Sequence, residues 1–138
     1  TDSVLLGSTF IVGGQIKDQP PELYLVYPQG NYIRPADSKP YLVIGEVKYG
    51  KPILDRVITP KVSIGDASRC ALISMDSTLK SDLTVGPPID FAVIKKDEIK
   101  IASLKCLNMN DPEFSKVCNQ WSQGIFKIFD SFQRFDWE

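Results

Sequence analysis

The sequence predicts an α+β fold in which strands and helices occupy separate stretches of the chain. Short segments rich in β-forming residues come first, two helical patterns follow, and a predicted hairpin then precedes one long helix. Segregated strands and helices are typical of layers built from antiparallel sheets. The chain has 138 residues, which is enough for one modest domain.

The first third of the chain is predicted to form strands. The segments 9–15 and 23–27 are rich in β-branched and aromatic residues, and 31–33 is a short return strand. Pro28 and Gly30 stand between the last two segments at positions that suit a turn. The first strand follows only a few residues at the start of the sequence, so we expect no leading element to cover it.

A strongly apolar segment, Tyr41–Ile44, is also predicted to be a strand. Polar and apolar residues do not alternate in it, which predicts burial on both faces. Gly45 ends the run and marks a tight bend or a close approach of the backbone. Charged residues follow at once, beginning with Glu46 and Lys48. Functional sites are often built where such an element ends, so this junction is a candidate site.

Two helices are predicted after this junction. Pro52 is tolerated only in a first helical turn, so a short helix begins close to it and ends near Ile58. Ser63 is a typical N-cap, with an acidic residue three positions later, and it starts a strongly periodic helix that runs to about Lys80. The composition of residues 81–88 predicts a loop.

The last part of the chain predicts a β-hairpin and a long helix. Residues 89–94 alternate as a strand, and 98–104 return as its hairpin partner. Asp111 is a good N-cap because Pro112 follows it at the first helical position. The apolar residues of the helix form one aromatic stripe, which comprises Phe114, Val117, Cys118, Trp121, Ile125, Ile128, Phe129 and Phe132. Such a stripe lies against a sheet or a partner, and it predicts a helix core rather than a ligand groove.

Composition excludes several classes of function. The net charge of −1, without a basic patch, gives no indication of binding to nucleic acid or to an anionic membrane. No apolar run is long enough to cross a bilayer. No signal peptide is predicted, and a cytoplasmic location is expected. The chain has no histidine, which removes His-based triads and the common zinc sites.

The three cysteines, Cys70, Cys106 and Cys118, are expected to be free thiols in a reducing compartment. Their number is odd, and no two of them have CxxC spacing. Cys70 and Cys118 lie on apolar helix faces, which predicts a packing role. No metal or other cofactor is expected, and Gly13 and Gly14 lack the spacing of a phosphate-binding loop. Any enzymatic chemistry must therefore come from carboxylates, amines, hydroxyls or thiols.

Several phrases of the sequence resemble the bacterial proteasome-like peptidases, a family often called Anbu. They are FIVGGQIK at 10–17, YPQGN at 27–31, IGEVKYGKPILDRVI at 44–58 and TVGPPIDFAVI at 84–94. The resemblance implies an N-terminal-nucleophile hydrolase fold, a four-layer αββα sandwich of two antiparallel sheets between outer helices. The order of predicted elements matches only the second half of that fold. We therefore expect residues 1–138 to be a single partial domain, the C-terminal portion of a subunit.

The resemblance also implies an activity. Members of this family are threonine-type peptidases that act on peptide or unfolded-protein substrates within a ring or ring-like homo-oligomer. Nothing in the chain resembles the half that carries the nucleophile, so the chain alone is expected to be inactive. An N-terminal threonine such as Thr1 can be nucleophile and base together. The resemblance, however, places Thr1 just before a mid-chain strand, where no nucleophile belongs.

Supporting roles in catalysis are implied for three residues. The resemblance matches Asp82 to an aspartate beside the nucleophile, and it puts Thr84 one residue before the hydroxyl position, where this chain has Val85. Asp82 can hold a terminal ammonium through a charge-assisted hydrogen bond, or it can cap its own turn. Glu46 stands where proteasome subunits have a serine. With Lys48 it can position the terminal amine or form a solvated ion pair.

Two other functions stay open. In the first, the subunit is catalytically silent and supplies packing surface to an assembly, which the absence of a hydroxyl or thiol at the mature N-terminus would favour. In the second, the chain is a complete small α+β binding module, although the uncovered first strand and the match to half a fold argue against it. Half a fold leaves unpaired sheet edges. We therefore expect the chain by itself to be poorly stable or associated.

Overall fold

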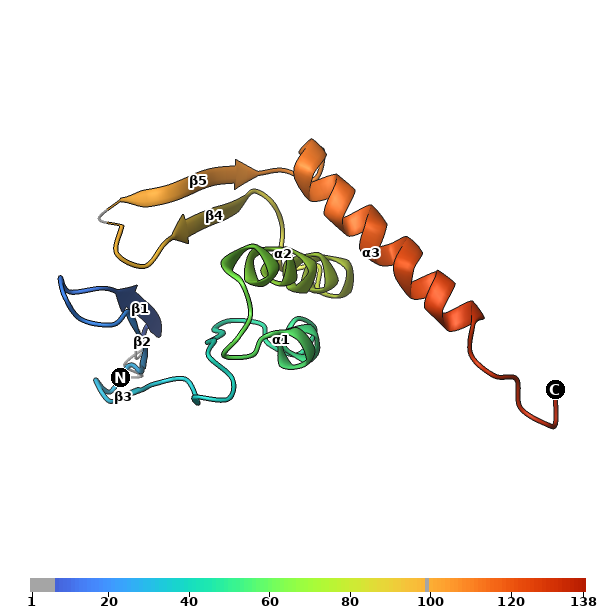
Figure 1. The fold of residues 1–138 in the computed structure, drawn as a ribbon, viewed down its shortest axis with the longest axis horizontal. Helices are drawn as coiled ribbons and strands as arrows, with labels where there is room; N and C mark the ends of the chain where they lie inside the picture. The colour runs from blue at the N-terminus through green and yellow to red at the C-terminus, as the bar shows by residue number, and fades with distance from the viewer. Residues whose placement is uncertain (1–6, 99) are drawn as a thin grey trace, which may run out of the picture.

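The computed structural model describes residues 7–98 and 100–138, which form two antiparallel sheets and three helices (Figure 1). Their order is β1–β2–β3–α1–α2–β4–β5–α3. In Figure 1 the strands lie mainly to the left and the helices to the right, and α3 with the C-terminal segment extends away from the sheets. The predicted α+β class is confirmed. Among the described residues, no helix has the length and apolar character needed to cross a membrane.

The first sheet is an antiparallel meander of β1 (Phe10–Gly14), β2 (Glu22–Val26) and β3 (Tyr32–Ile33), in that order. Every residue of β1 is exposed, and Leu25 is the one buried residue of the three strands. Side chains on both faces of β1 are therefore left exposed by the described residues. Its second edge also has no partner strand among the residues described.

The segment Tyr41–Ile44 is not a strand, which corrects the sequence prediction. It pairs with no strand in the described part of the chain. Tyr41 and Val43 are half-buried against the core between α1 and α2, whereas Ile44 is exposed. An apolar run predicts burial, but a strand also needs a neighbour that satisfies its backbone hydrogen bonds. That neighbour is absent from the described residues.

Helices α1 (Lys51–Val57) and α2 (Ile64–Ser81) begin where the sequence predicts them. Ser63 caps α2 through its side-chain oxygen. Gly50 is the N-cap of α1 and makes no side-chain cap. A Cβ atom at Gly50 would lie 2.3 Å from the Ser74 Oγ. Glycine is therefore needed there because the start of α1 lies directly against α2.

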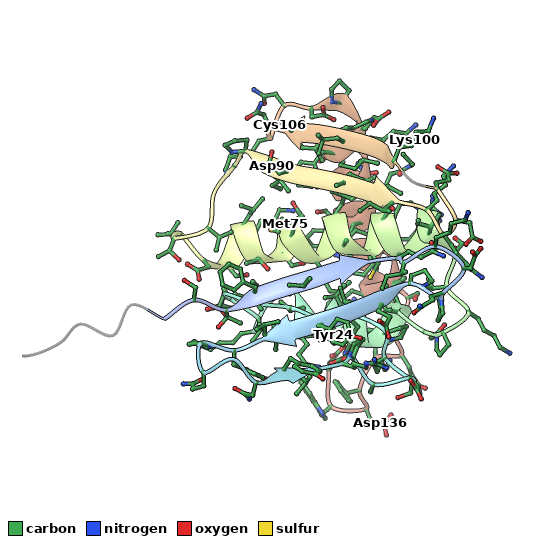
Figure 2. The ribbon with its side chains drawn as sticks, turned by 90° about the vertical axis from the view of Figure 1, so that its left-hand side faces the viewer. Tyr24, Met75, Asp90, Lys100, Cys106 and Asp136 are labelled. Carbon is green, nitrogen blue, oxygen red and sulfur yellow. The ribbon has the colours of Figure 1, made fainter. Side chains whose placement is uncertain are left out.

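The hairpin of β4 (Ile89–Ile94) and β5 (Ile101–Leu107) packs with α2 and α3 (Pro112–Asp130). Figure 2 shows α2 between this hairpin and the first sheet. β5 begins at Ile101, later than predicted, and a turn closed by the Glu98 N–H and the Lys95 carbonyl lies between the two strands. One core cluster comprises Ile89, Leu107, Phe114 and Cys118, and the other comprises Ile53, Leu54, Ile58 and Cys70. The burial of two cysteines confirms their predicted packing role, and all three cysteines are free thiols.

The aromatic stripe of α3, for which the sequence predicts a helix core, is buried only in part. Phe114 is 1% exposed and Cys118 is 7% exposed, because α2 and the hairpin cover the first half of the helix. Ile125 is 48% exposed and Phe129 is 68% exposed. The same face of the helix therefore leaves the core about halfway along its length.

A reciprocal pair of hydrogen bonds joins the two sheets at one end. The Gln15 side-chain amide donates to the Asp97 Oδ1, and the Asp97 backbone N–H donates to the Gln15 Oε1, each at 2.7 Å. Gln15 directly follows β1, and Asp97 lies in the turn between β4 and β5. This contact is at the end of the hairpin opposite to the loop that connects α2 with β4.

Candidate functional site

The candidate site lies where α2 ends and the loop to β4 begins. Asp82 is the C-cap of α2, and its backbone N–H donates to the Thr78 carbonyl at 2.9 Å. The Asp82 Oδ1 accepts hydrogen bonds from the backbone N–H and the hydroxyl of Thr84, at 2.8 and 2.7 Å. Asp82 and Thr84 are therefore in contact, and the carboxylate caps its own turn.

Asp82 is held in its anionic form. The hydroxyl and then the backbone N–H of Thr84 lower the pKa of the Asp82 carboxyl below its ordinary value of 3.8, and the positive charge of Lys48 lowers that pKa further. Hydrogen bonds donated to a carboxylate favour its charged form. Among the described residues, no donor reaches the Asp82 Oδ2. That oxygen is available to a further donor.

Glu46 lies in the loop before α1 and closes a turn of its own. Its Oε1 accepts a hydrogen bond from the backbone N–H of Lys48 at 2.9 Å. The ammonium of Lys48 forms no ion pair with Glu46 in the described part of the chain. A backbone contact thus takes the place of the Glu46–Lys48 ion pair considered from the sequence. The charge of Lys48 acts on Asp82 instead.

Close packing of α1 on α2 brings the loop 46–48 near the end of α2. A Cβ atom at Gly50 would lie 2.3 Å from the Ser74 Oγ and 3.2 Å from the Thr78 Oγ1. Thr78 is one helical turn before Asp82 and accepts its backbone hydrogen bond. The loop is therefore held beside the last turn of α2, which explains how the charge of Lys48 reaches Asp82.

Three further features were considered from the sequence: Thr1, the hydroxyl position at Val85, and a metal site. Thr1 lies outside the described residues. Val85 is half-buried at the position where the resemblance expects a hydroxyl, and its N–H donates to the Asp82 carbonyl at 3.3 Å. Within the described ranges, no group of three or more histidine, cysteine, aspartate or glutamate side chains could hold a metal ion.

A second polar cluster, between α2 and α3, was not predicted. Asp76 is 2% exposed, and its Oδ2 accepts a hydrogen bond from Lys80 at 2.8 Å. Lys80 also donates to the Ser122 Oγ at 3.3 Å. Burial, together with the neighbouring Asp76 carboxylate, raises the pKa of the Cys118 thiol to about 11. The sequence held a signal, because Asp76 is four residues after Leu72 and thus lies on the apolar face of α2.

A third polar cluster fastens the segment after β3 to α1. The Tyr41 hydroxyl donates to the Asp55 Oδ1 at 2.5 Å, and the Lys51 Nζ donates to the Asp55 Oδ2 at 2.7 Å. The hydrogen bonds from Lys51 and then from Tyr41 lower the pKa of the Asp55 carboxyl. Lys39 donates to the Asp55 carbonyl. These polar groups bind one another, so the cluster is suited to holding the chain in place.

Comparison with known proteins identifies one family. The family model described as "Proteasome subunit" matches residues 5–94, which is well over half of the chain. A comparison with curated proteins gives no match. Solved structures do match, and structures of proteins called Anbu are among them.

Three of these structures illustrate the similarity. An Anbu (Gly-1) mutant from Hyphomicrobium sp. strain MC1 is 42% identical with a TM-score of 0.89, and the match covers 94% of this chain and 57% of that one. The helical assembly of the Anbu complex from Pseudomonas aeruginosa is 42% identical with a TM-score of 0.88, covering 94% and 54%. Anbu (ancestral beta-subunit) from Yersinia bercovieri is 40% identical with a TM-score of 0.88, covering 91% and 54%. The chain spans little more than half the length of these solved relatives.

Proposed function

Because the chain belongs to the proteasome subunit family, we propose that it is part of a threonine-type peptidase subunit that hydrolyses peptide bonds within a homo-oligomer. Residues 1–138 then form one partial domain, and the upstream half of the subunit carries the nucleophile. The chain spans 57% of the Anbu subunit from Hyphomicrobium at 42% identity, which supports a missing half. The helical assembly of the relative from Pseudomonas aeruginosa supports the homo-oligomer. The substrates would be peptides or unfolded proteins.

The anionic Asp82 is the observation that carries this proposal. In our proposal the N-terminal ammonium of the upstream half donates to the Asp82 Oδ2, the oxygen that no described residue binds. A charge-assisted hydrogen bond of this kind would stabilise the ammonium that forms when the terminal amine takes the proton of the attacking hydroxyl. Thr84 would orient the carboxylate through its two hydrogen bonds to Oδ1.

Lys48 and Glu46 would adjust the same proton transfer. A carboxylate beside the terminal amine, here that of Asp82, raises the pKa of the amine. The amine then stays protonated, which hinders its use as a base. The positive charge of Lys48 acts in the opposite direction. Glu46 would hold Lys48 in place, because its side chain accepts the Lys48 backbone N–H. We therefore propose Asp82, Thr84 and Glu46 as supporting residues rather than nucleophiles.

The test uses the full-length subunit with its natural N-terminus and a set of peptide substrates. Asp82→Ala is expected to lower kcat by about 100-fold or more, which is the usual contribution of a positioned proton-transfer system. Asp66→Ala is the matched control, because Asp66 is an exposed carboxylate at the opposite end of α2. Full activity of Asp82→Ala would remove Asp82 from the site.

A catalytically silent subunit is the second candidate function. The observation in its favour is Val85, which stands where the resemblance expects a hydroxyl beside the nucleophile. In this case the subunit would contribute packing surface to the assembly and nothing to catalysis. An assembled full-length subunit that cleaves no peptide, in any variant or at any pH, would support this function over the peptidase.

A further inference from the structure

We propose that the second half of α3 and the segment after it form a contact surface for a second copy of the subunit. This aromatic surface comprises Ile125, Ile128, Phe129, Phe132, Phe135 and Trp137, whose exposed fractions range from 48% to 79%. The inference rests on the homo-oligomer proposed above. It adds the place at which the copies meet. This surface is separate from the candidate site around Asp82.

The aromatic surface continues the face by which α3 packs on the core. Residues three or four positions apart share one face of a helix, so Phe114, Cys118, Ile125 and Phe129 are aligned. Phe114 and Cys118 are buried, whereas Ile125 and Phe129 are about half and two-thirds exposed (48% and 68%). Soluble monomers seldom leave such a continuous apolar face open, and exposed apolar patches of this kind usually mark interaction sites.

Contacts within the aromatic surface organise it in advance. The rings of Phe129 and Phe132 meet edge to face with centroids 6.0 Å apart. Phe135 and Trp137 stack with centroids 5.3 Å apart and an interplanar angle of 9°. Preformed ring pairs have less conformational freedom to lose when a partner binds. The segment after the helix therefore belongs to the same surface as the helix face.

The size of the aromatic surface suits one side of a protein interface. An aromatic side chain offers about 150–250 Å², so the exposed parts of the four aromatic rings amount to roughly 500 Å². An interface of standard size buries about 800 Å² on each partner, of which roughly 60% is apolar. The two values agree, and the flanking isoleucines add to the apolar area.

The upstream half of the subunit does not account for the aromatic surface. The chain needs partner strands at the open edge of β1 and along Tyr41–Ile44, where no described strand pairs. Figure 1 shows β1 on the left of the molecule and the second half of α3 at the far right. A segment that completes the first sheet would therefore lie away from the aromatic surface. A second copy brings a new surface to that side.

A lipid surface fits less well than a second copy. Asp130, Asp136 and Glu138 flank the aromatic residues, and only Lys127 and Arg134 balance them. Binding to anionic lipid relies on clusters of basic residues, which are missing here. An apolar centre with charges of both signs around it is typical of a protein–protein interface.

The test compares the assembly of full-length subunits by sedimentation over a range of concentrations. Phe129→Asp is expected to raise the concentration of half-assembly at least tenfold, because a buried aromatic anchor usually contributes more than this. Gln123→Asp is the matched control, since Gln123 is exposed on the opposite face of α3 and gains the same charge. Trp137→Ser, outside the helix, is expected to weaken assembly without touching helix formation.

Each outcome has a definite meaning. Assembly of Phe129→Asp and Trp137→Ser at wild-type concentrations would overturn the inference while leaving the proposed homo-oligomer intact. A wild-type subunit that stays monomeric would overturn both. A lower unfolding temperature of Phe129→Asp, measured where the wild type is also dissociated, would overturn the inference too, because the surface would then belong to the subunit's own core.

Discussion

Two carboxylates on α2 are stabilised by different means. Asp82 caps the helix, is half-buried, and receives two hydrogen bonds from Thr84, so its charge meets both solvent and local donors. Asp76 is buried to 2% exposure and has Lys80 as its cation. A buried charge depends strongly on its one partner, whereas a partly exposed one does not. The first carboxylate is therefore suited to a site, and the second is suited to joining α2 with α3.

Lys80→Met tests the role of the buried carboxylate. The substitution leaves Asp76 without the ammonium that binds its Oδ2. We expect the free energy of unfolding of the full-length subunit to fall by about 3 kcal/mol, because an uncompensated buried charge remains. Denaturant unfolding measures this change. Lys116→Met, at an exposed position of α3, is the control and is expected to stay within about 0.5 kcal/mol.

A double variant completes this test. Asp76→Leu combined with Lys80→Met removes both charges, and we expect it to recover most of the lost stability because no charge is then left buried alone. Equal stability of Lys80→Met and the wild type would contradict the role assigned to the pair.

The raised pKa of Cys118 predicts a pH-dependent stability. The thiol titrates near an ordinary value of 9.0 when unfolded and at about 11 when folded. The unfolded chain therefore loses its proton first, so stability is fully present below pH 9 and decreases between pH 9 and 11. We expect Cys118→Ala to show a flatter dependence over this window in pH-dependent unfolding. Some slope is expected to persist, because burial also raises the pKa of Cys70.

Local and non-local contacts of the site differed in how far the sequence could predict them. Asp82 and Thr84 are two residues apart after a helix, so the carboxylate reaches the Thr84 N–H and hydroxyl within one turn. The action of Lys48 on Asp82 was not predictable, because these residues are distant in sequence and meet only through the packing of Gly50 on α2. The alternative considered from the sequence, an ion pair between Lys48 and Glu46, rested only on the closeness of these two residues in the sequence.

At the scale of elements, helix starts were predicted accurately because their signals are local. Ser63 and Asp111 each accept backbone N–H bonds at a helix start, and Pro112 follows the second cap. Strand pairing depends on distant neighbours, which explains why Tyr41–Ile44 is not a strand. The apolar stripe of α3 also depends on distant neighbours. Its periodicity predicts which face of the helix is apolar, but not how much of that face another element covers.

Gly50→Ala tests the packing of α1 against α2. The added methyl group would meet the Ser74 Oγ at 2.3 Å and the Ser74 carbonyl oxygen at 3.1 Å. Ser74 is buried, so relief requires α1 to move. We expect a loss of about 1–3 kcal/mol in the free energy of unfolding. Gly124→Ala is the control, because no atom lies within 4 Å of its Cβ position, and it is expected to stabilise α3 by about 1 kcal/mol.

At the scale of the whole molecule, large apolar side chains are exposed in several places, and two of these regions bear on assembly. In the first sheet, Phe10, Val12 and Tyr32 are 58%, 53% and 64% exposed. The other region is the aromatic surface of α3. The two regions lie on opposite sides of the molecule in Figure 1. In our proposal they have different occupants, the upstream half of the subunit at the first sheet and a second copy at α3.

This division predicts the behaviour of residues 1–138 prepared alone. The exposed faces of β1, and its edge that pairs with no strand among the described residues, favour association with another strand, since unpaired edges act as templates for pairing. We expect the isolated chain to self-associate and to unfold without a sharp transition, as followed by sedimentation and thermal unfolding. Val12→Lys is expected to reduce this association, because a charge on a strand edge opposes pairing. Gln123→Lys, on the polar side of α3, adds the same charge elsewhere and is expected to leave it unchanged.

The proposed upstream half supplies the complementary experiment. If it covers the first sheet, adding it as a separate polypeptide should suppress the association that Val12→Lys suppresses, and it should give a cooperative unfolding transition. The association that depends on Phe129 should persist after this addition, because the aromatic surface stays open. A monomeric isolated chain that unfolds cooperatively at low concentration would contradict this division, since it would show that both regions are stable without any occupant.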